Sequence, residues 1–320
     1  MKNIELSIVI PVYNSEECLH ELNRQIEESL YGFEYEIIFI NDRSKDNSWN
    51  KIIEICEKNK KAFGISLRKN SGQDNALMAG LRLAKGEYIA IMDDDLQHSP
   101  HDILKLYNEC KKGYDLCYGF FQGKKQSLWK NFGSWVNGKL SEKLWSKPKE
   151  IYLSPFKVFR GEIAKEITQY TGPYPYLDAI LLTITNNITQ IPIEHYQRYK
   201  GKGNFNLFRS ITVFLMNATG YSIYPLRLAT YLGFFSAFIG FMFAVYYLAE
   251  YLLNNHRVEG WITNILLILF FSGIILISLG IIGEYIGRIF LTINKRPQYT
   301  IEKLSTQSIT NSKNSELITQ

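Results

Sequence analysis

The chain has 320 residues and a formal net charge of +5. This length is enough for one α/β domain with a sizeable core and an additional segment. The modest charge and the absence of a nucleic-acid-binding motif exclude DNA and RNA as expected partners. The four cysteines are scattered without a Cys-x-x-Cys pair, which argues against a zinc site or disulfide framework and favours reduced thiols in the cytosol. The chain runs at once into an apolar strand and shows no signal-peptide pattern.

Strands alternate with helices through the first hundred residues. Apolar runs predict strands over residues 6–12, 35–40, 63–67 and 88–92. Helical patterns follow the first three of these runs. The alternation is typical of a doubly wound, mostly parallel α/β sheet, in which ligands bind at the carboxyl ends of the strands.

Polar residues gather where these predicted strands end. They are Pro11, Tyr13, Asn14, Asp42, Asn70, Gln73 and the segment 93–97. No Gly-x-Gly-x-x-Gly follows the first strand and no Walker lysine loop is present, which argues against a dinucleotide cofactor and a P-loop NTPase. The strand ends instead suit a nucleotide whose base and ribose are hydrogen-bonded and whose diphosphate is held by a cation.

Three carboxylates, Asp93, Asp94 and Asp95, follow the fourth predicted strand. Residues two apart in a strand point the same way, so Asp93 and Asp95 can converge while Asp94 points elsewhere. A hard divalent cation, Mg²⁺ or Mn²⁺, would relieve their repulsion and also accept oxygens from a substrate diphosphate. The triplet alone is equally compatible with a solvated acidic turn before a helix capped by Ser99.

Four short motifs occur in order along this region: Ile8–Asn14, Asn41–Asp46, Asn70–Gln73 and Asp93–Gln97. Together they resemble the family 2 glycosyltransferases of the GT-A fold. The resemblance is strongest to the polyisoprenyl-phosphate branch, which includes dolichol-phosphate mannose synthases and bacterial undecaprenyl-phosphate sugar transferases. It covers residues 4 to 290. Four motifs in register are more specific than any one of them.

The resemblance implies roles for the strand-end residues. In that family the second-strand aspartate, here Asp42, contacts the nucleotide base. The D-x-D pair, here Asp93 and Asp95, is catalytic and holds Mg²⁺ or Mn²⁺ on the donor diphosphate. The remaining expected nucleotide-sugar-binding residues are Pro11, Tyr13, Asn14, Asn70, Gln73, Asp94 and Gln97.

The middle of the chain departs from the family pattern. Phe121 replaces the first basic residue of a Gly-x-Arg-x-x-Arg pattern, for which Lys124 or Lys125 supplies the second. The family's Gly-Asp-Phe-Arg stretch, whose Asp has been considered a base, falls at residues 153–160, which contain no aspartate. Asp178 is the next candidate for a catalytic carboxylate on the acceptor side, with a residue at a helix N-terminus as the alternative.

A basic loop precedes the apolar part of the chain. Arg198 and Gly201 match the family's Arg-x-x-Gly-x-Ser-x-Tyr motif, whose Ser and Tyr are replaced here. Glycine lets backbone N–H groups approach a phosphate, and Arg198, Lys200 and Lys202 supply positive charge. We expect this loop, together with Lys124, to bind the acceptor phosphate. A solvated or membrane-facing surface is the alternative.

Two long apolar runs, about 228–253 and 261–286, each reach the roughly 20 residues that cross a bilayer. The link between them is short, which predicts a transmembrane hairpin over residues 225–290. Residues 205–224 are amphipathic and predict a helix in the membrane interface.

Basic residues flank the two apolar runs, namely Arg227 before the first run and Arg288, Lys295 and Arg296 after the second. The positive-inside rule therefore places both termini and a catalytic domain of residues 1–204 in the cytoplasm, with the hairpin in the plasma membrane. The tail over residues 291–320 becomes polar, and we expect disorder after Tyr299.

These features predict a membrane glycosyltransferase that moves a sugar from a nucleotide-sugar to polyprenyl (undecaprenyl) phosphate, with inversion, for a cell-envelope glycan or lipid. A phosphate monoester has its second pKa near 6, so the acceptor needs little help from a base. The alternatives are another membrane lipid or glycan acceptor, or a non-catalytic scaffold that binds nucleotide-sugar. A flippase is less favoured because the apolar helices contain few charges. The resemblance also implies a homo-oligomer, a tetramer.

Overall fold

A computed structural model describes residues 4–121, 147–194, 219–254 and 260–305. Internal contacts divide the chain into two units, one of residues 1–204 with 295–320 and one of residues 205–294. Most of the amphipathic helix predicted over 205–224 lies outside the described residues. So do the four basic residues predicted to bind phosphate, which are Lys124, Arg198, Lys200 and Lys202.

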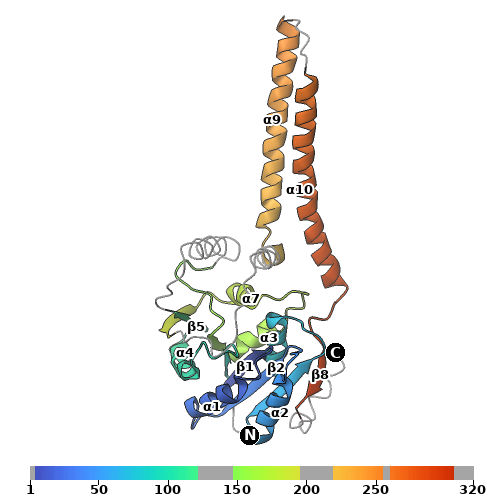
Figure 1. Ribbon diagram of the computed structural model, residues 1–320. Coiled ribbons are helices and arrows are strands. Elements are labelled where there is room, and N and C mark those ends of the chain that lie inside the picture. The colour runs from blue at the N-terminus through green and yellow to red at the C-terminus, as the bar shows by residue number, and fades with distance from the viewer. Residues whose placement is uncertain (1–3, 122–146, 195–218, 255–259, 306–320) are drawn as a thin grey trace. The chain divides into compact units, whose positions relative to one another are not determined.

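Among the residues that the structure describes, the first unit is built on one sheet of eight strands. Part of this sheet can be followed in Figure 1. The strands are β1 (Leu6–Val12), β2 (Tyr35–Asn41), β3 (Ala62–Leu67), β4 (Tyr88–Ile91), β5 (Leu116–Phe121), β6 (Lys157–Arg160), β7 (Ile188–Ile193) and β8 (Ile301–Leu304). Their order in the sheet is β7-β5-β6-β4-β1-β2-β3-β8, and only β6 and β8 run antiparallel to their neighbours. The doubly wound, mostly parallel sheet is confirmed, and β1 to β4 occupy nearly the predicted ranges.

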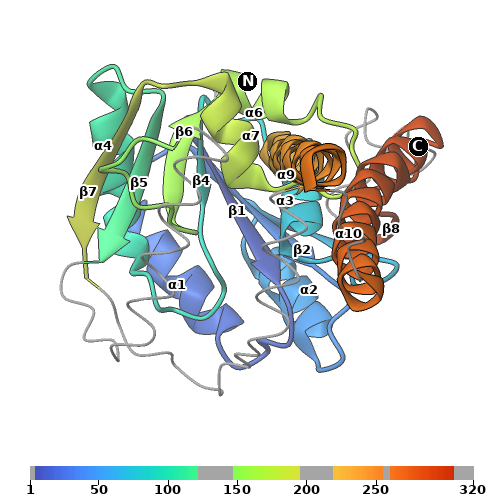
Figure 2. The ribbon, with the colours of Figure 1, turned by 90° about the horizontal axis from the view of Figure 1, so that it is seen from above.

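Helices cover both faces of this sheet (Figure 2). They are α1 (Leu19–Ser29), α2 (Ser48–Lys58), α3 (Gln73–Leu81), η1 (Pro100–Asp102), α4 (Ile103–Lys111), α6 (Gly161–Ile167) and α7 (Leu177–Ile184). Apolar residues of α1, α2 and α4 form one buried cluster with one face of the strands. On the other face α3 packs so closely that a Cβ on Gly80 would lie 2.6 Å from Val9 Cγ1 and 2.7 Å from Ile40 Cδ1. This packing holds the first turn of α3 at the carboxyl edge of the sheet.

The C-terminal tail returns to the sheet of the first unit, where β8 pairs with β3. Just beyond β8, the backbone N–H of Ser305 donates to Gly64 O at 2.9 Å, and the Ser305 hydroxyl accepts from Gly64 N at 2.9 Å. The prediction of disorder after Tyr299 is therefore wrong for residues 301–304, because a polar segment can still pair its backbone with an open strand edge. Residues 306–320 lie outside the described part of the chain.

The second unit contains two long helices, α9 (Tyr224–Asn254) and α10 (Trp261–Ile293). Within them, Tyr224–Glu250 and Leu267–Ile293 are long and apolar enough to cross a membrane. Their large apolar side chains are mostly exposed, as for Phe234, which is 72% exposed. A helix in a soluble core would bury such side chains, so these surfaces suit contact with lipid.

Candidate active site

The carboxyl ends of four adjacent parallel strands define the candidate site. Because β4, β1, β2 and β3 are neighbours in the sheet, the residues that follow them meet along one edge. Contacts join the segments in pairs. Tyr13, after β1, donates its backbone N–H to Asp94 Oδ2, after β4, at 3.1 Å. Asn70, after β3, donates from Nδ2 to Asp42 O, at the end of β2, at 3.1 Å.

The three carboxylates after β4 have three different hydrogen-bond partners. Asp93 Oδ1 accepts a hydrogen bond from Gln73 Nε2 at 2.8 Å. Asp94 is turned toward the backbone after β1, and Asp95 Oδ1 accepts from Gln97 N at 3.1 Å. Leu96, which follows the triplet, has a φ of +58°, a backbone conformation that non-glycine residues seldom adopt and that is concentrated at functional sites.

The electrostatics of this triplet fit a divalent cation. Burial raises the pKa of Asp93 to about 7, and the negative charges of Asp95 and Asp94 add to the effect. Burial likewise raises the pKa of Asp94 to about 6. Crowded carboxylates with hard oxygen atoms are ligands that Mg²⁺ and Mn²⁺ accept. In the described residues no group of three or more His, Cys, Asp or Glu side chains could hold a metal ion, so a cation at Asp93 and Asp95 would take its other ligands from water or a substrate.

Asp42 organises the loop that follows β3. The carboxylate is buried, and it accepts the backbone N–H of Ser71 at 2.6 Å and that of Gly72 at 2.8 Å. Burial raises the pKa of Asp42, and the two N–H groups oppose that shift. Gly72 has a φ of +90°, which glycine adopts without strain, and α3 begins at the next residue. Asp42 thus places the start of α3 beside the strand ends.

Asn14 joins the loops after β1 and β2. Its side-chain Oδ1 accepts from Lys45 N at 2.8 Å, and its own N–H donates to Ser44 Oγ at 3.0 Å. Its φ of +55° is the left-handed conformation that asparagine tolerates better than most residues. A non-glycine residue fixed in this way at a strand end fits a rigid surface for a bound ligand.

Two of the residues predicted to bind donor contribute less to this network. Pro11 is buried within β1. Gln97 uses its backbone N–H on Asp95, and its side chain makes no hydrogen bond within the described part of the chain. The side chains of these two residues therefore do not take part in the hydrogen bonds that join the other predicted residues along this edge.

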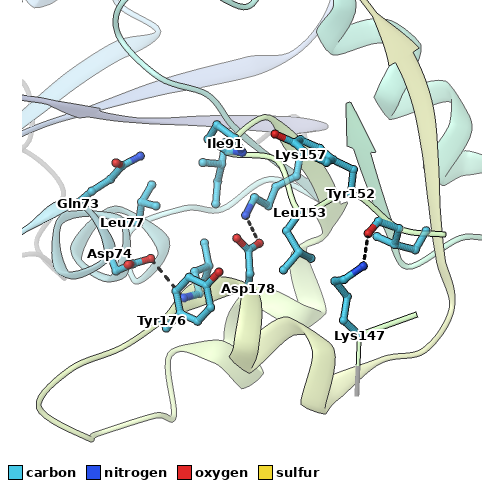
Figure 3. A pocket seen from close by; sticks show the side chains of 13 residues that line it. Gln73, Asp74, Leu77, Ile91, Lys147, Tyr152, Leu153, Lys157, Tyr176 and Asp178 are labelled. Atoms are coloured by element: carbon cyan, nitrogen blue, oxygen red, sulfur yellow. Dashed lines mark hydrogen bonds and ion pairs between the residues drawn. The ribbon is translucent and has the colours of Figure 1, made fainter. Parts of the chain in front are cut away.

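Asp178 lies in the first turn of α7, across a pocket of about 370 Å³. Figure 3 shows Gln73 and Asp74 on one side of this pocket, with Lys157 and Asp178 facing them. Asp178 Oδ1 accepts from Tyr118 Oη at 2.8 Å and forms an ion pair with Lys157. Gln73 belongs to this pocket and also contacts Asp93, so the pocket adjoins the D-x-D pair. Asp178 therefore lies at a helix N-terminus and also lines the pocket, and its role as a catalytic carboxylate on the acceptor side stays a prediction.

Sequence reasoning missed Lys157 and Asp74. Lys157 is the only charged residue of the segment 153–159, and its side chain is 3% exposed. The available signal was this lone charge within a mostly apolar segment. Asp74 lies in the first turn of α3, where the helix dipole favours an acidic residue whatever its function. The sequence around Asp74 therefore does not indicate a binding role.

Comparison with known proteins identifies the two parts of the chain. Residues 7–168 match the family model "Glycosyl transferase family 2", and residues 224–289 match "GtrB C-terminal hairpin". An uncharacterized glycosyltransferase of Synechocystis sp. is 30% identical over 94% of this chain and 96% of its own length.

Two other relatives have more specific names. The SfII prophage-derived bactoprenol glucosyl transferase of Shigella flexneri is 29% identical over 94% of this chain and 98% of its own. The undecaprenyl-phosphate 4-deoxy-4-formamido-L-arabinose transferase of Klebsiella pneumoniae is 29% identical over 97% of this chain and 96% of its own.

Among solved structures, glucosyl-3-phosphoglycerate synthase from Mycobacterium tuberculosis in complex with Mn²⁺, UDP and product aligns with a TM-score of 0.51 and 18% identity. The alignment covers 68% of this chain and 80% of that one. This likeness shows the fold. The open sheet with a D-x-D pair at its carboxyl edge defines a glycosyltransferase of the GT-A fold. The chain belongs to glycosyl transferase family 2.

Proposed function

We propose that the protein transfers a sugar from a nucleotide-sugar to polyprenyl phosphate, with undecaprenyl phosphate as the acceptor in a bacterial cell. The observation that carries the proposal is the presence, in one chain, of the D-x-D strand end and an apolar helical hairpin matched by the GtrB hairpin model. Relatives named for bactoprenol or undecaprenyl phosphate align along nearly the whole chain, which supports the same acceptor.

The donor binds at the carboxyl edge of β4, β1, β2 and β3. Asp42, Asn14 and the loops they organise hold the nucleoside, and Asp93 and Asp95 hold a Mg²⁺ or Mn²⁺ ion beside the diphosphate. When bound, this ion neutralises the charge that develops on the departing nucleotide diphosphate. Gln73 fixes the Asp93 carboxylate from the start of α3.

The acceptor phosphate oxygen attacks the anomeric carbon from the face opposite the leaving diphosphate. The new oxygen–carbon bond forms as the bond to the diphosphate oxygen breaks, and the sugar is inverted. The second pKa of a phosphate monoester is near 6, so near neutral pH the nucleophile has already lost its proton. Asp178, held by Tyr118 and Lys157, orients groups in the pocket rather than removing a proton.

The hairpin anchors the catalytic unit to the plasma membrane, with both termini in the cytoplasm, where the lipid carrier and the nucleotide-sugar meet. Lys124, Arg198, Lys200 and Lys202 bind the acceptor phosphate, since their charge suits a dianion. The homo-oligomer implied by the family resemblance stays a prediction.

Transfer to a lipid tests the proposal directly. Membranes containing the protein are incubated with undecaprenyl phosphate and radiolabelled UDP-, GDP- or dTDP-sugars, with and without EDTA. We expect a labelled, chloroform-soluble product from one donor, lost with EDTA. Asp93→Asn and Asp95→Asn should reduce transfer at least about 100-fold, the scale on which removal of one charge-stabilising group acts. Glu109→Gln, which changes a partly buried carboxylate on α4 that pairs with Lys112, is the control.

If no donor gives a lipid product while nucleotide still binds, polyprenyl phosphate is not the acceptor. The function would then be transfer to another membrane acceptor or a non-catalytic role. If transfer survives EDTA and both Asp variants, the assignment of the D-x-D pair as a metal site is wrong.

A further inference from the structure

We propose that Asp74 is a specificity-determining residue for the donor sugar. In this proposal the sugar lies in the pocket between α3 and α7, and one of its ring hydroxyls donates a hydrogen bond to the Asp74 carboxylate. This inference rests on the proposed function and deepens it, because it assigns the sugar to a place and its recognition to a residue. Asp74 lies outside the four sequence motifs, one residue beyond Asn70–Gln73.

The location of Asp74 puts it within reach of a sugar attached to the donor diphosphate. It is adjacent to Gln73, whose side chain contacts Asp93 at 2.8 Å. Both Gln73 and Asp74 line the pocket of about 370 Å³, and pockets of roughly 300–1,000 Å³ are of the size that holds small ligands. A diphosphate at Asp93 therefore presents its sugar to this pocket.

The charges of the pocket favour an uncharged polyol over a phosphate. Asp178 is paired with Lys157, and Lys147 Nζ donates to the carbonyls of Pro148 and Ile151, at 3.1 and 2.7 Å. Asp74 has no salt bridge among the described residues. A phosphate dianion would meet the negative charge of Asp74, which Lys157 offsets only in part, whereas sugar hydroxyls can donate to it.

Asp74 has one carboxylate oxygen to offer. Oδ1 accepts the backbone N–H of Leu177, at the start of α7, at 3.2 Å, and Oδ2 has no hydrogen bond in the described structure (Figure 3). Burial raises the pKa of Asp74 to about 6, with the charge of Asp178 adding to the shift, so the group is mostly a carboxylate above pH 7. Hydrogen bonds from a neutral donor to a charged acceptor are among the stronger ones in proteins.

The rest of the lining suits a sugar ring. Leu77 and Leu153 provide apolar surface, and Tyr176 lies beside Asp74 (Figure 3). A pocket that combines apolar and aromatic walls with a few placed polar groups is the usual setting for recognition of a small polar ligand.

The test separates recognition from a structural role. Asp74→Asn keeps an oxygen for Leu177 N–H and replaces the other oxygen with an amide donor. Binding of UDP alone is compared by calorimetry with binding of UDP-glucose, UDP-galactose, UDP-N-acetylglucosamine and UDP-xylose, which differ at single ring positions, and the GDP and dTDP series are compared in the same way. These measurements need no lipid acceptor.

We expect the variant to bind the nucleoside diphosphate as the wild type does. The preference between two sugars that differ at one ring carbon should change by about 10- to 100-fold, the range expected for a hydrogen bond to a charged group. Glu109→Gln should leave every preference unchanged.

Equal weakening of all sugars, with preferences kept within twofold, would show that Asp74 acts only through Leu177 and would overturn the inference. Absence of nucleotide-sugar binding by the wild type in every series would overturn the donor site and this inference with it. Altered sugar preference without any lipid product would support the inference and count against the polyprenyl-phosphate acceptor alone.

Discussion

Asp93 connects binding with stability at the scale of a single residue. Its pKa is about 7 in the folded protein, against an ordinary value of 3.8. The folded state therefore keeps the Asp93 proton to a higher pH than the unfolded state does. The tighter binding of this proton by the folded state contributes fully to the free energy of unfolding below pH 4. That contribution decreases as the pH rises and is lost once the pH has passed 7. Above that pH the protein contains a partly buried negative charge, which Gln73 and Lys157 offset only in part and a bound cation would compensate further.

Asp93→Asn should for this reason be more stable relative to the wild type at pH 8 than at pH 5, when EDTA is present. The measurement is the melting temperature of the purified protein in detergent at both pH values. Adding Mg²⁺ or Mn²⁺ at pH 8 should raise the melting temperature of the wild type and leave that of Asp93→Asn nearly unchanged. Glu162→Gln, an exposed carboxylate change, serves as the control. A pH-independent difference between Asp93→Asn and the wild type would contradict the assigned shift.

The buried pair of Lys157 and Asp178 should behave as a unit. Removing one partner leaves an unpaired buried charge, which typically costs about 3–5 kcal/mol. Lys157→Met and Asp178→Asn should each lower the melting temperature, and the double variant should be more stable than the sum of the single effects predicts. Additive losses, measured by thermal unfolding of all three variants, would show that the two groups are not coupled.

At the scale of the element, β8 is expected to stabilise the catalytic unit. A chain ending at Lys295 loses the pairing with β3 and the two contacts of Ser305 with Gly64. We expect an unfolding free energy lower by more than about 2 kcal/mol, since each backbone hydrogen bond contributes on the order of 1 kcal/mol. Glu302→Ala is the matched control, because it keeps β8 and removes only a partly exposed ion pair with Arg43, worth at most about 1 kcal/mol. If the truncated chain had the melting temperature of the wild type, β8 would not contribute to the stability of the catalytic unit.

The elements show why the sequence predicts some features and not others. β1 to β4 were predictable because each is a continuous apolar run, and the D-x-D pair follows from the alternation of side chains after β4. β8 has only four residues, and it becomes a strand because β3 offers an open edge, which no local pattern reveals. The pairing of Lys157 with Asp178 joins β6 to α7, and the pocket that contains Asp74 exists only once α3 and α7 face each other.

At the scale of the whole molecule, β8 constrains how the chain crosses a membrane. β3 precedes α9 and α10 in the sequence, and β8 follows them, yet the two strands belong to one sheet. The segment between them must therefore cross a bilayer an even number of times. This constraint comes from the β3–β8 pairing alone and does not depend on the basic residues near the apolar helices.

Reporter fusions should show the same arrangement. Green fluorescent protein fused after residue 320 should fluoresce in the cytoplasm, and alkaline phosphatase fused within the link at residues 255–259 should be active outside it. An active phosphatase fused at residue 320 would mean that β8 and β3 lie on opposite sides of the membrane. That result would contradict the eight-stranded sheet.

The position of β8 also sets an order of events during synthesis of the protein. The ribosome completes β3 more than two hundred residues before it reaches Ser305, and both apolar helices emerge in between. The edge of β3 therefore stays open while the hairpin enters the membrane, and an open strand edge invites pairing with other chains. β8 can pair with β3 only after both apolar helices have been synthesised, so the catalytic unit stays incomplete while the hairpin is being made.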